Sequence, residues 1–249
     1  MEPMRFLIEG APTPPMAQVM ALARRAARTT ASVLITGESG TGKRALARWI
    51  HGSGARAHSR VIELGRAAHT EVALIEAARD RVQYGVFGDA AGGTLVVDEV
   101  GELSSEAQAA LVQLLDLATL RPVGLHGTRV IATSRHAAAA LRPDLYYALG
   151  VIAIAMPALR QRAGDIPALV AGILARSAPP GRRGVQVSDA ALAWLCHAPW
   201  PGNVRELETT IERAVALCEG SVIEIADLRA PGPRDQAGPP STSIVPPLK

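Results

Sequence analysis

The sequence predicts an α/β fold, a parallel sheet covered by helices, followed by a small all-helical lid domain. Short apolar runs of β-branched and aliphatic residues alternate with segments of helical periodicity in the first part of the chain. A glycine-rich turn joins the first apolar run directly to a helical segment. Beyond residue 156 the strand-like runs stop, and helical segments follow one another. These three observations favour a parallel α/β domain with a helical appendage.

The individual elements follow from local patterns. Buried strands are expected over 32–36, 94–97, 129–133 and 151–155, which are short and apolar. An amphipathic helix is expected over 16–28, and another directly after the glycine-rich turn. Ser105 and Gln108 have the spacing of a capping box and predict that a further helix begins there. Helices are also expected around 166–176, 189–197 and 203–218.

These elements divide the chain into four parts. An irregular lead-in is predicted over residues 1–15, the α/β domain over 16–156 and the helical lid over 157–228. The last 21 residues, 229–249, contain six prolines and no helical periodicity, which predicts a disordered tail. The α/β domain carries the nucleotide-binding signals described below.

Composition excludes several classes of protein. Hydrophobic residues make up 48% of the 249 positions and charged residues 20%, which is enough to bury a core. No uncharged apolar run approaches the length of a membrane span, and the first ten residues lack the apolar region of a secretory signal. The two cysteines, Cys196 and Cys218, cannot form a disulfide framework. A cytoplasmic protein without a membrane segment is therefore expected.

The basic residues give only a weak indication of nucleic-acid binding. Lys and Arg number 26 against 23 Asp and Glu, a net charge of +3, and only Lys43 and Lys249 are lysines. The arginines are scattered singly among alanines and glycines. A solvated surface explains this distribution better than a phosphate-binding patch on DNA would.

The strongest chemical signal is GESGTGK at residues 37–43, between a predicted strand and a predicted helix. It matches G-x-x-x-x-G-K, in which glycines let backbone N–H groups face a phosphate and the lysine reaches the β- and γ-phosphates. The expected nucleotide-binding residues of this phosphate loop are Gly37, Glu38, Ser39, Gly40, Thr41, Gly42, Lys43 and Arg44.

A second acidic signal complements the loop. Asp98 and Glu99 follow the predicted strand 94–97, where a carboxylate can hold Mg²⁺ directly or through water. The adjacent glutamate can polarise an attacking water. Arg44 occupies the position at which the general pattern has a Ser or Thr that binds Mg²⁺, so Thr41 or water would have to substitute. The expected metal ligand is thus Asp98, in a site weaker than the phosphate site.

Four segments together resemble the AAA+ domain of sigma-54-dependent transcriptional activators, the bacterial enhancer-binding proteins. They are GESGTGK, GGTLVVDEVGELS, RPDLYYALGV and PWPGNVRELETTIERAV, in the family's order. The resemblance covers about residues 8–228. That family lacks a Ser or Thr after the loop lysine, which makes Arg44 a lesser anomaly. The resemblance implies ATP and Mg²⁺ as cofactors and assembly into a ring.

The resemblance also implies residue roles. Lys43 would bind phosphate, Asp98 would serve Mg²⁺ and Glu99 would activate water. Arg142 matches the arginine finger offered to the γ-phosphate of a neighbouring subunit. Arg205 matches the lid arginine that senses the γ-phosphate.

The chain departs from the family pattern in several places. The sequence GAFTGA, with which the family engages sigma-54, is absent between Val61 and Ala91. The second arginine-finger position is Ala148, the sensor asparagine is Ser134, and the asparagine that couples the catalytic glutamate to the nucleotide is replaced by Gly65. No helix-turn-helix is readable after the lid.

Two functions are therefore expected. The first is an ATP-binding AAA+ transcriptional regulator with weak ATPase activity and without direct sigma-54 or DNA contact of its own. The alternative is a non-catalytic ATP-binding protein that hetero-oligomerises with a full-length activator and modulates it. Direct DNA binding through scattered arginines is the weakest hypothesis, because no recognition element is visible.

Overall fold

The structure, a computed structural model, describes residues 12–65, 67–79, 85–120, 127–135, 141–177 and 184–229. Side chains of residues 67–68 and 117–120 are outside this description. Most of the predicted lead-in, up to residue 11, and the predicted tail from residue 230 onward lie outside the described residues.

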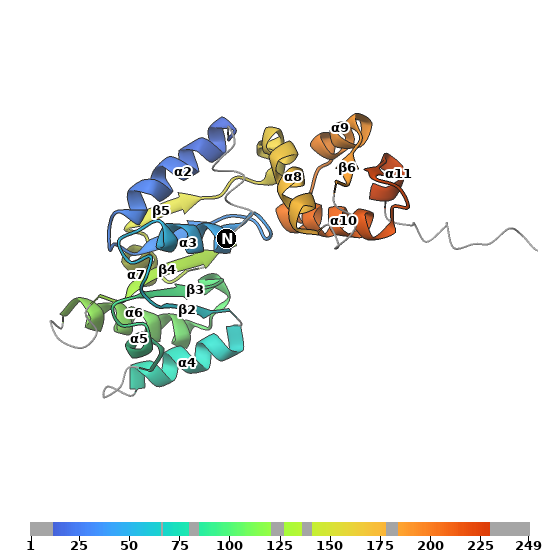
Figure 1. Cartoon of the computed structure of the whole chain (residues 1–249). Helices are drawn as coiled ribbons and strands as arrows, with labels where there is room; N and C mark the ends of the chain where they lie inside the picture. The colour runs from blue at the N-terminus through green and yellow to red at the C-terminus, as the bar shows by residue number, and fades with distance from the viewer. Residues whose placement is uncertain are drawn as a thin grey trace, which may run out of the picture.

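The α/β part contains the sheet and the helices that cover it (Figure 1). In chain order its elements are α2 (Pro14–Ala27), β1 (Val33–Thr36), α3 (Lys43–Gly52), β2 (Val61–Leu64), α4 (Ala67–Arg79), α5 (Gly85–Asp89), β3 (Thr94–Val97), the 3-10 turn η1 (Val100–Glu102), α6 (Ser105–Leu120), β4 (Arg129–Ser134), α7 (Pro143–Leu149) and β5 (Ile152–Ala155).

The lid follows β5. Its elements are the 3-10 turns η3 (Leu159–Gln161) and η4 (Ala163–Asp165), then α8 (Ile166–Ser177), β6 (Gln186–Val187), α9 (Asp189–His197), α10 (Asn203–Leu217), β7 (Val222–Ile223) and α11 (Ile225–Leu228).

The sheet is parallel, with strand order β2-β3-β4-β1-β5, so the predicted parallel α/β fold is confirmed. Val33 of β1 pairs with Ile131 of β4 on one side and with Ile152 of β5 on the other. The sequence pattern did not predict β2. This strand lies at the sheet edge and its four residues are only half-buried, so it lacks the apolar run of a buried strand.

Side chains of the interior strand β1 alternate between two apolar clusters, one on each face of the sheet. Val33 and Ile35 belong to the cluster formed with α2 and α3, while Leu34 belongs to the cluster formed with α4, α6 and α7. The first cluster continues into the lid through Leu159 and Leu207. The lid is thereby packed against the α/β part beyond the carboxyl end of β5 (Figure 1).

The lid is helical as predicted, with one correction to the expected all-helical character. The two-residue strands β6 and β7 pair in parallel, with Gln186 opposite Val222. Strands this short carry no readable periodicity, so they could not be predicted from the pattern of apolar residues.

The helix α6 begins at Ser105, as predicted, but its cap differs from the predicted one. Ser104, not Ser105, caps the helix, because its Oγ accepts a hydrogen bond from the backbone N–H of Ala107 at 3.3 Å. The side chain of Gln108 is used elsewhere, since its Nε2 donates to the carbonyl of Leu103 at 3.0 Å.

Among the described residues, none of the helices combines the length and the apolar character that crossing a bilayer requires.

Candidate nucleotide-binding site

The phosphate loop lies between β1 and α3 in a backbone conformation that depends on glycine. Gly37, Gly40 and Gly42 have φ angles of 145°, 78° and 100°. A Cβ at Gly40 would lie 2.2 Å from the carbonyl oxygen of Gly202 in the lid. Gly40 is therefore required both for its conformation and for the close approach of the lid to the loop.

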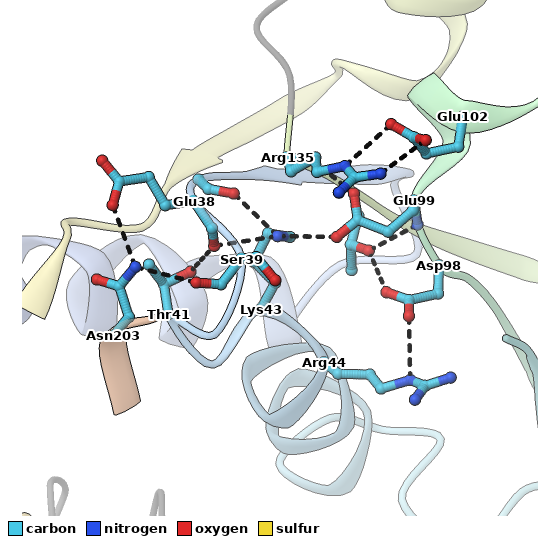
Figure 2. Close-up of polar contacts among 12 residues, drawn as sticks. Glu38, Ser39, Thr41, Lys43, Arg44, Asp98, Glu99, Glu102, Arg135 and Asn203 are labelled. Atoms are coloured by element: carbon cyan, nitrogen blue, oxygen red, sulfur yellow. Dashed lines mark hydrogen bonds and ion pairs between the residues drawn. The ribbon is translucent and has the colours of Figure 1, made fainter. Parts of the chain in front are cut away.

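Lys43 is the first residue of α3 and is 5% exposed. Its Nζ donates to the carbonyl oxygens of Gly37 at 2.9 Å and Glu38 at 3.3 Å, and lies 3.0 Å from Oε1 of Glu99 (Figure 2). The ammonium group is thus held inside the curve of the loop, where the sequence motif places it, and it bridges the loop to the end of β3.

Asp98 and Glu99 follow β3 and are fixed by the end of β4. The hydroxyl of Thr133 donates to Oδ1 of Asp98 at 2.5 Å and accepts the backbone N–H of Glu99 at 3.0 Å. Oε2 of Glu99 accepts the backbone N–H of Arg135 at 2.7 Å. Glu99 has a φ of 53°, a left-handed conformation that costs free energy and is common at functional sites. Both carboxylates are therefore pre-positioned beside the phosphate loop.

Arg44 contacts the carboxylate predicted to bind Mg²⁺. Its Nε lies 3.4 Å from Oδ2 of Asp98, while Oδ1 of the same carboxylate accepts from Thr133. The described part of the chain has no group of three or more His, Cys, Asp or Glu side chains placed to hold a metal. As the chain stands, these residues do not fit a Mg²⁺ site at Asp98, although a carboxylate is the right ligand type.

These side chains surround a pocket of about 280 Å³. The pocket has four cationic and two anionic side chains, so its wall carries an excess of positive charge that suits a polyanion. Its lining residues are Ser39, Gly40, Gly42, Lys43, Arg44, Asp98, Glu99, Arg135 and Arg205.

Asn203 of the lid holds the phosphate loop, a role that the sequence motifs did not predict. Its buried Nδ2 donates to the carbonyl oxygen of Ser39 at 2.9 Å and to Oε2 of Glu38 at 3.1 Å (Figure 2). Its Oδ1 accepts the backbone N–H of Leu159 at 2.8 Å. The available signal in the sequence is an asparagine at the start of a helix, directly after Pro-Gly.

Two arginines of the lid also bind the phosphate loop. Arg160 pairs with both carboxylate oxygens of Glu38, at 2.6 and 2.9 Å. The hydrogen bonds from Arg160, and then from Asn203, lower the pKa of Glu38 from 4.5 to about 2. Arg162 is buried and donates from Nη2 to the carbonyl oxygen of Thr41 at 2.7 Å, and burial lowers the pKa of its guanidinium.

The two arginines predicted to reach the γ-phosphate lie in different places. Arg205 is exposed on α10 and lines the phosphate pocket, and its guanidinium has no hydrogen-bond or ion-pair partner among the described residues. Arg142 precedes α7 and is not among the residues that line this pocket. Its Nη2 pairs with Asp144 at 2.8 Å, and its backbone N–H donates to Oε1 of Gln108 at 2.9 Å.

The positions that depart from the family pattern are also visible. Ala148 lies on α7, partly buried against the cluster of α4, α6 and α7. Ser134 is buried at the end of β4. Gly65 follows β2, and a Cβ there would lie 2.3 Å from Nη2 of Arg44. The structure thus brings the loop, Asp98, Glu99 and Arg205 together, and leaves Arg142 apart.

Family models match both parts of the chain. Residues 10–155 match the sigma-54 interaction domain, and residues 160–242 match an AAA+ ATPase lid domain. The chain belongs to the sigma-54 interaction domain family. The resemblance drawn from the sequence motifs is therefore confirmed.

Similar proteins are transcriptional regulators. The chain is 37% identical to the transcriptional regulatory protein ZraR of Escherichia coli K12, in an alignment that covers 87% of this chain. It is also 37% identical to the Nif-specific regulatory protein of Klebsiella pneumoniae, in an alignment that covers 85% of this chain. It covers 54% and 44% of these proteins, so it spans about half the length of the curated relatives it matches.

Solved structures agree with this assignment. NtrX from Brucella abortus in complex with ATP is 28% identical, with a TM-score of 0.74 over 89% of this chain and 56% of NtrX. A point mutant of RuvB from Thermotoga maritima, 16% identical with a TM-score of 0.56 over 85% of this chain and 66% of that one, shares the fold.

Proposed function

We propose that this chain is an ATP-binding AAA+ regulator of transcription that has weak ATPase activity on its own. The observation that carries the proposal is the cationic pocket at the phosphate loop, in which Lys43 is already directed at the loop carbonyls. The triphosphate would replace the carbonyls as the partner of Lys43 and would supply the missing partner of Arg205. The ATP complex of NtrX supports this ligand.

A second pocket beside the first provides room for the nucleoside. It has a volume of about 230 Å³ and shares Arg44 and Arg205 with the phosphate pocket. Its wall combines apolar side chains, among them Leu169 and Val204, with four arginines and Glu208. A wall of this mixed character beside the phosphate pocket suits a molecule with a flat base and an anionic tail.

We expect slow hydrolysis because both carboxylate oxygens of Glu99 already have partners. Oε1 is paired with Lys43 and Oε2 accepts from Arg135, so both oxygens of the proposed general base are engaged. A base must reach the attacking water to take its proton. Arg142 lies outside the pocket of its own chain, and Ala148 offers no second finger, so charge that develops on the transferring phosphoryl group lacks part of its usual stabilisation.

The alternative, a non-catalytic partner of a full-length activator, is favoured by one observation. A subunit that binds ATP but presents Ala148 instead of an arginine would weaken the site of its neighbour in a ring. The proposed partner is therefore a second copy or a related AAA+ activator. The absence of GAFTGA between Val61 and Ala91 supports the proposal that this chain makes no sigma-54 contact itself.

The test compares binding with turnover on the purified chain. Calorimetric titration with ATP, ADP and GTP should show binding of the adenine nucleotides, and a coupled phosphate-release assay should show slow hydrolysis. Adding a full-length activator should change the hydrolysis rate of the mixture. Absence of ATP binding would contradict both candidate functions, whereas fast hydrolysis by the chain alone would contradict its weak activity.

A further inference from the structure

Two adjacent cations begin α3, where a helix least tolerates them. The N-terminal end of a helix carries positive potential, and here the first turn holds Lys43 and Arg44 and no acidic residue. Each cation is compensated by one carboxylate at the end of β3, since Lys43 pairs with Glu99 and Arg44 with Asp98. The start of α3 thus depends on these two carboxylates to compensate its positive charge.

Arg44 is directed at Asp98 rather than at the other nearby carboxylate. Glu63 already receives two hydrogen bonds from Arg48, at 2.5 and 2.7 Å, and lies 3.9 Å from Nε of Arg44. The corresponding distance from Arg44 to Asp98 is 3.4 Å. Figure 2 shows Arg44 reaching up to Asp98 from α3, below the phosphate loop.

Gly65 provides the space for this arrangement. An ideal Cβ at Gly65 would lie 2.3 Å from Nη2 of Arg44, so any larger residue would displace the guanidinium from its present position. Arg44 also lines the phosphate pocket, together with Lys43 and Arg205. Its positive charge therefore lies where a divalent cation would otherwise neutralise Asp98 and the phosphates.

We propose that Arg44 is a built-in cation that replaces the divalent metal at the phosphate pocket, so that the chain binds ATP without requiring Mg²⁺. The inference rests on the proposed ATP binding. Free ATP is repelled by the carboxylates of Asp98 and Glu99 unless a cation screens them. Arg44 supplies that screening, and its guanidinium has further N–H donors suited to phosphate oxygens.

The experiment titrates the full chain with a fluorescent ATP analogue, in buffer containing either Mg²⁺ or EDTA. The wild-type Kd should agree between the two buffers to within about threefold, a difference below 1 kcal/mol. Arg44→Gln should weaken binding by about tenfold in EDTA, as expected for the loss of one charge-assisted hydrogen bond, and less in Mg²⁺.

Three further variants control the interpretation. Arg79→Gln removes an exposed cation that pairs with Glu106 and lines neither pocket, and should leave the ratio of the two Kd values unchanged. Arg44→Ser introduces the hydroxyl that the general phosphate-loop pattern has after the lysine, and should make binding depend on Mg²⁺. Gly65→Asn should weaken binding in EDTA by displacing Arg44. Circular-dichroism melting curves verify that each variant folds.

The outcomes separate this inference from the proposed function. Loss of wild-type binding by more than about tenfold in EDTA would overturn the inference and leave ATP binding intact. An unchanged ratio in Arg44→Gln would overturn it as well. No binding by the wild type in either buffer would contradict ATP binding itself, and with it the inference.

Discussion

Arginines beside the phosphate pocket have different partners from the arginine on the α7 face, which is formed by Arg142, Tyr147 and Val151. Beside the pocket, two lid arginines are tied to the loop within the same chain, Arg160 to Glu38 and Arg162 to the carbonyl of Thr41. On the α7 face, Arg142 forms its ion pair with the nearby Asp144 and a long hydrogen bond to Ser105, and Tyr147 and Val151 are 77% and 64% exposed. The chain therefore holds its phosphate loop through its own lid, whereas the α7 face leaves large apolar side chains exposed.

The largest expected effect tests the pocket side of this comparison. Lys43→Met should reduce ATP affinity by about a hundredfold, because it removes the ammonium group that would face the β- and γ-phosphates in the proposed complex, a loss of about 2–3 kcal/mol. Titration with a fluorescent ATP analogue measures the loss. Arg79→Met, which removes an exposed cation far from the loop, is the control and should bind normally. Equal affinity in Lys43→Met and wild type would place ATP elsewhere.

The second prediction concerns the contact between lid and loop. Asn203→Ala should lower the free energy of unfolding by about 2–3 kcal/mol, because the buried N–H of Leu159 and the carbonyl of Ser39 lose their partners. Urea denaturation measures this change, and ATP affinity should fall with it. Thr209→Ala in the same helix, whose hydroxyl donates only to the carbonyl of Arg205, should cost well under that amount. Equal stability of the two variants would contradict the role of Asn203.

The third prediction separates the two faces directly. Arg205→Ala should weaken ATP binding by about tenfold and ADP binding less, since the guanidinium would reach the γ-phosphate. Arg142→Ala should leave the ATP affinity of the single chain unchanged, because Arg142 lies outside its own pocket. Parallel titrations with ATP and ADP measure both. A loss of ATP affinity in Arg142→Ala would break the distinction between the two faces.

The smallest expected effect is the pH dependence of the contact between Glu38 and Arg160. The pKa of Glu38 falls from 4.5 to about 2 in the folded chain, so its contribution to stability is complete above pH 4.5 and is lost as the pH falls toward 2. Glu38→Gln should therefore be less stable than wild type at neutral pH, by a margin that vanishes near pH 2. Thermal melts across this range measure the margin. A margin independent of pH would show that the carboxylate charge has no part in it.

The sequence was most informative where function depends on local chemistry. The order Gly37 to Lys43 after a β-branched run predicts the loop, because its turn requires glycines and its helix start requires the lysine. The sequence was least informative about the edge of the sheet, the helix cap and contacts between distant segments. β2 was missed because an edge strand is half-buried, and Ser105 was taken for the cap in place of Ser104 because neighbouring serines offer the same spacing.

The sequence by itself determined the fold class, the phosphate loop and the family, since each is encoded in consecutive residues or in the order of a few motifs. Only the tertiary structure showed that Asn203 holds the loop and that Arg44 pairs with Asp98. These pairs are separated by 164 and by 54 positions, and no local pattern predicts which distant side chain completes a charge or a hydrogen bond. The shared carboxyl edge of the parallel strands, and the lid packed beyond it, bring them together.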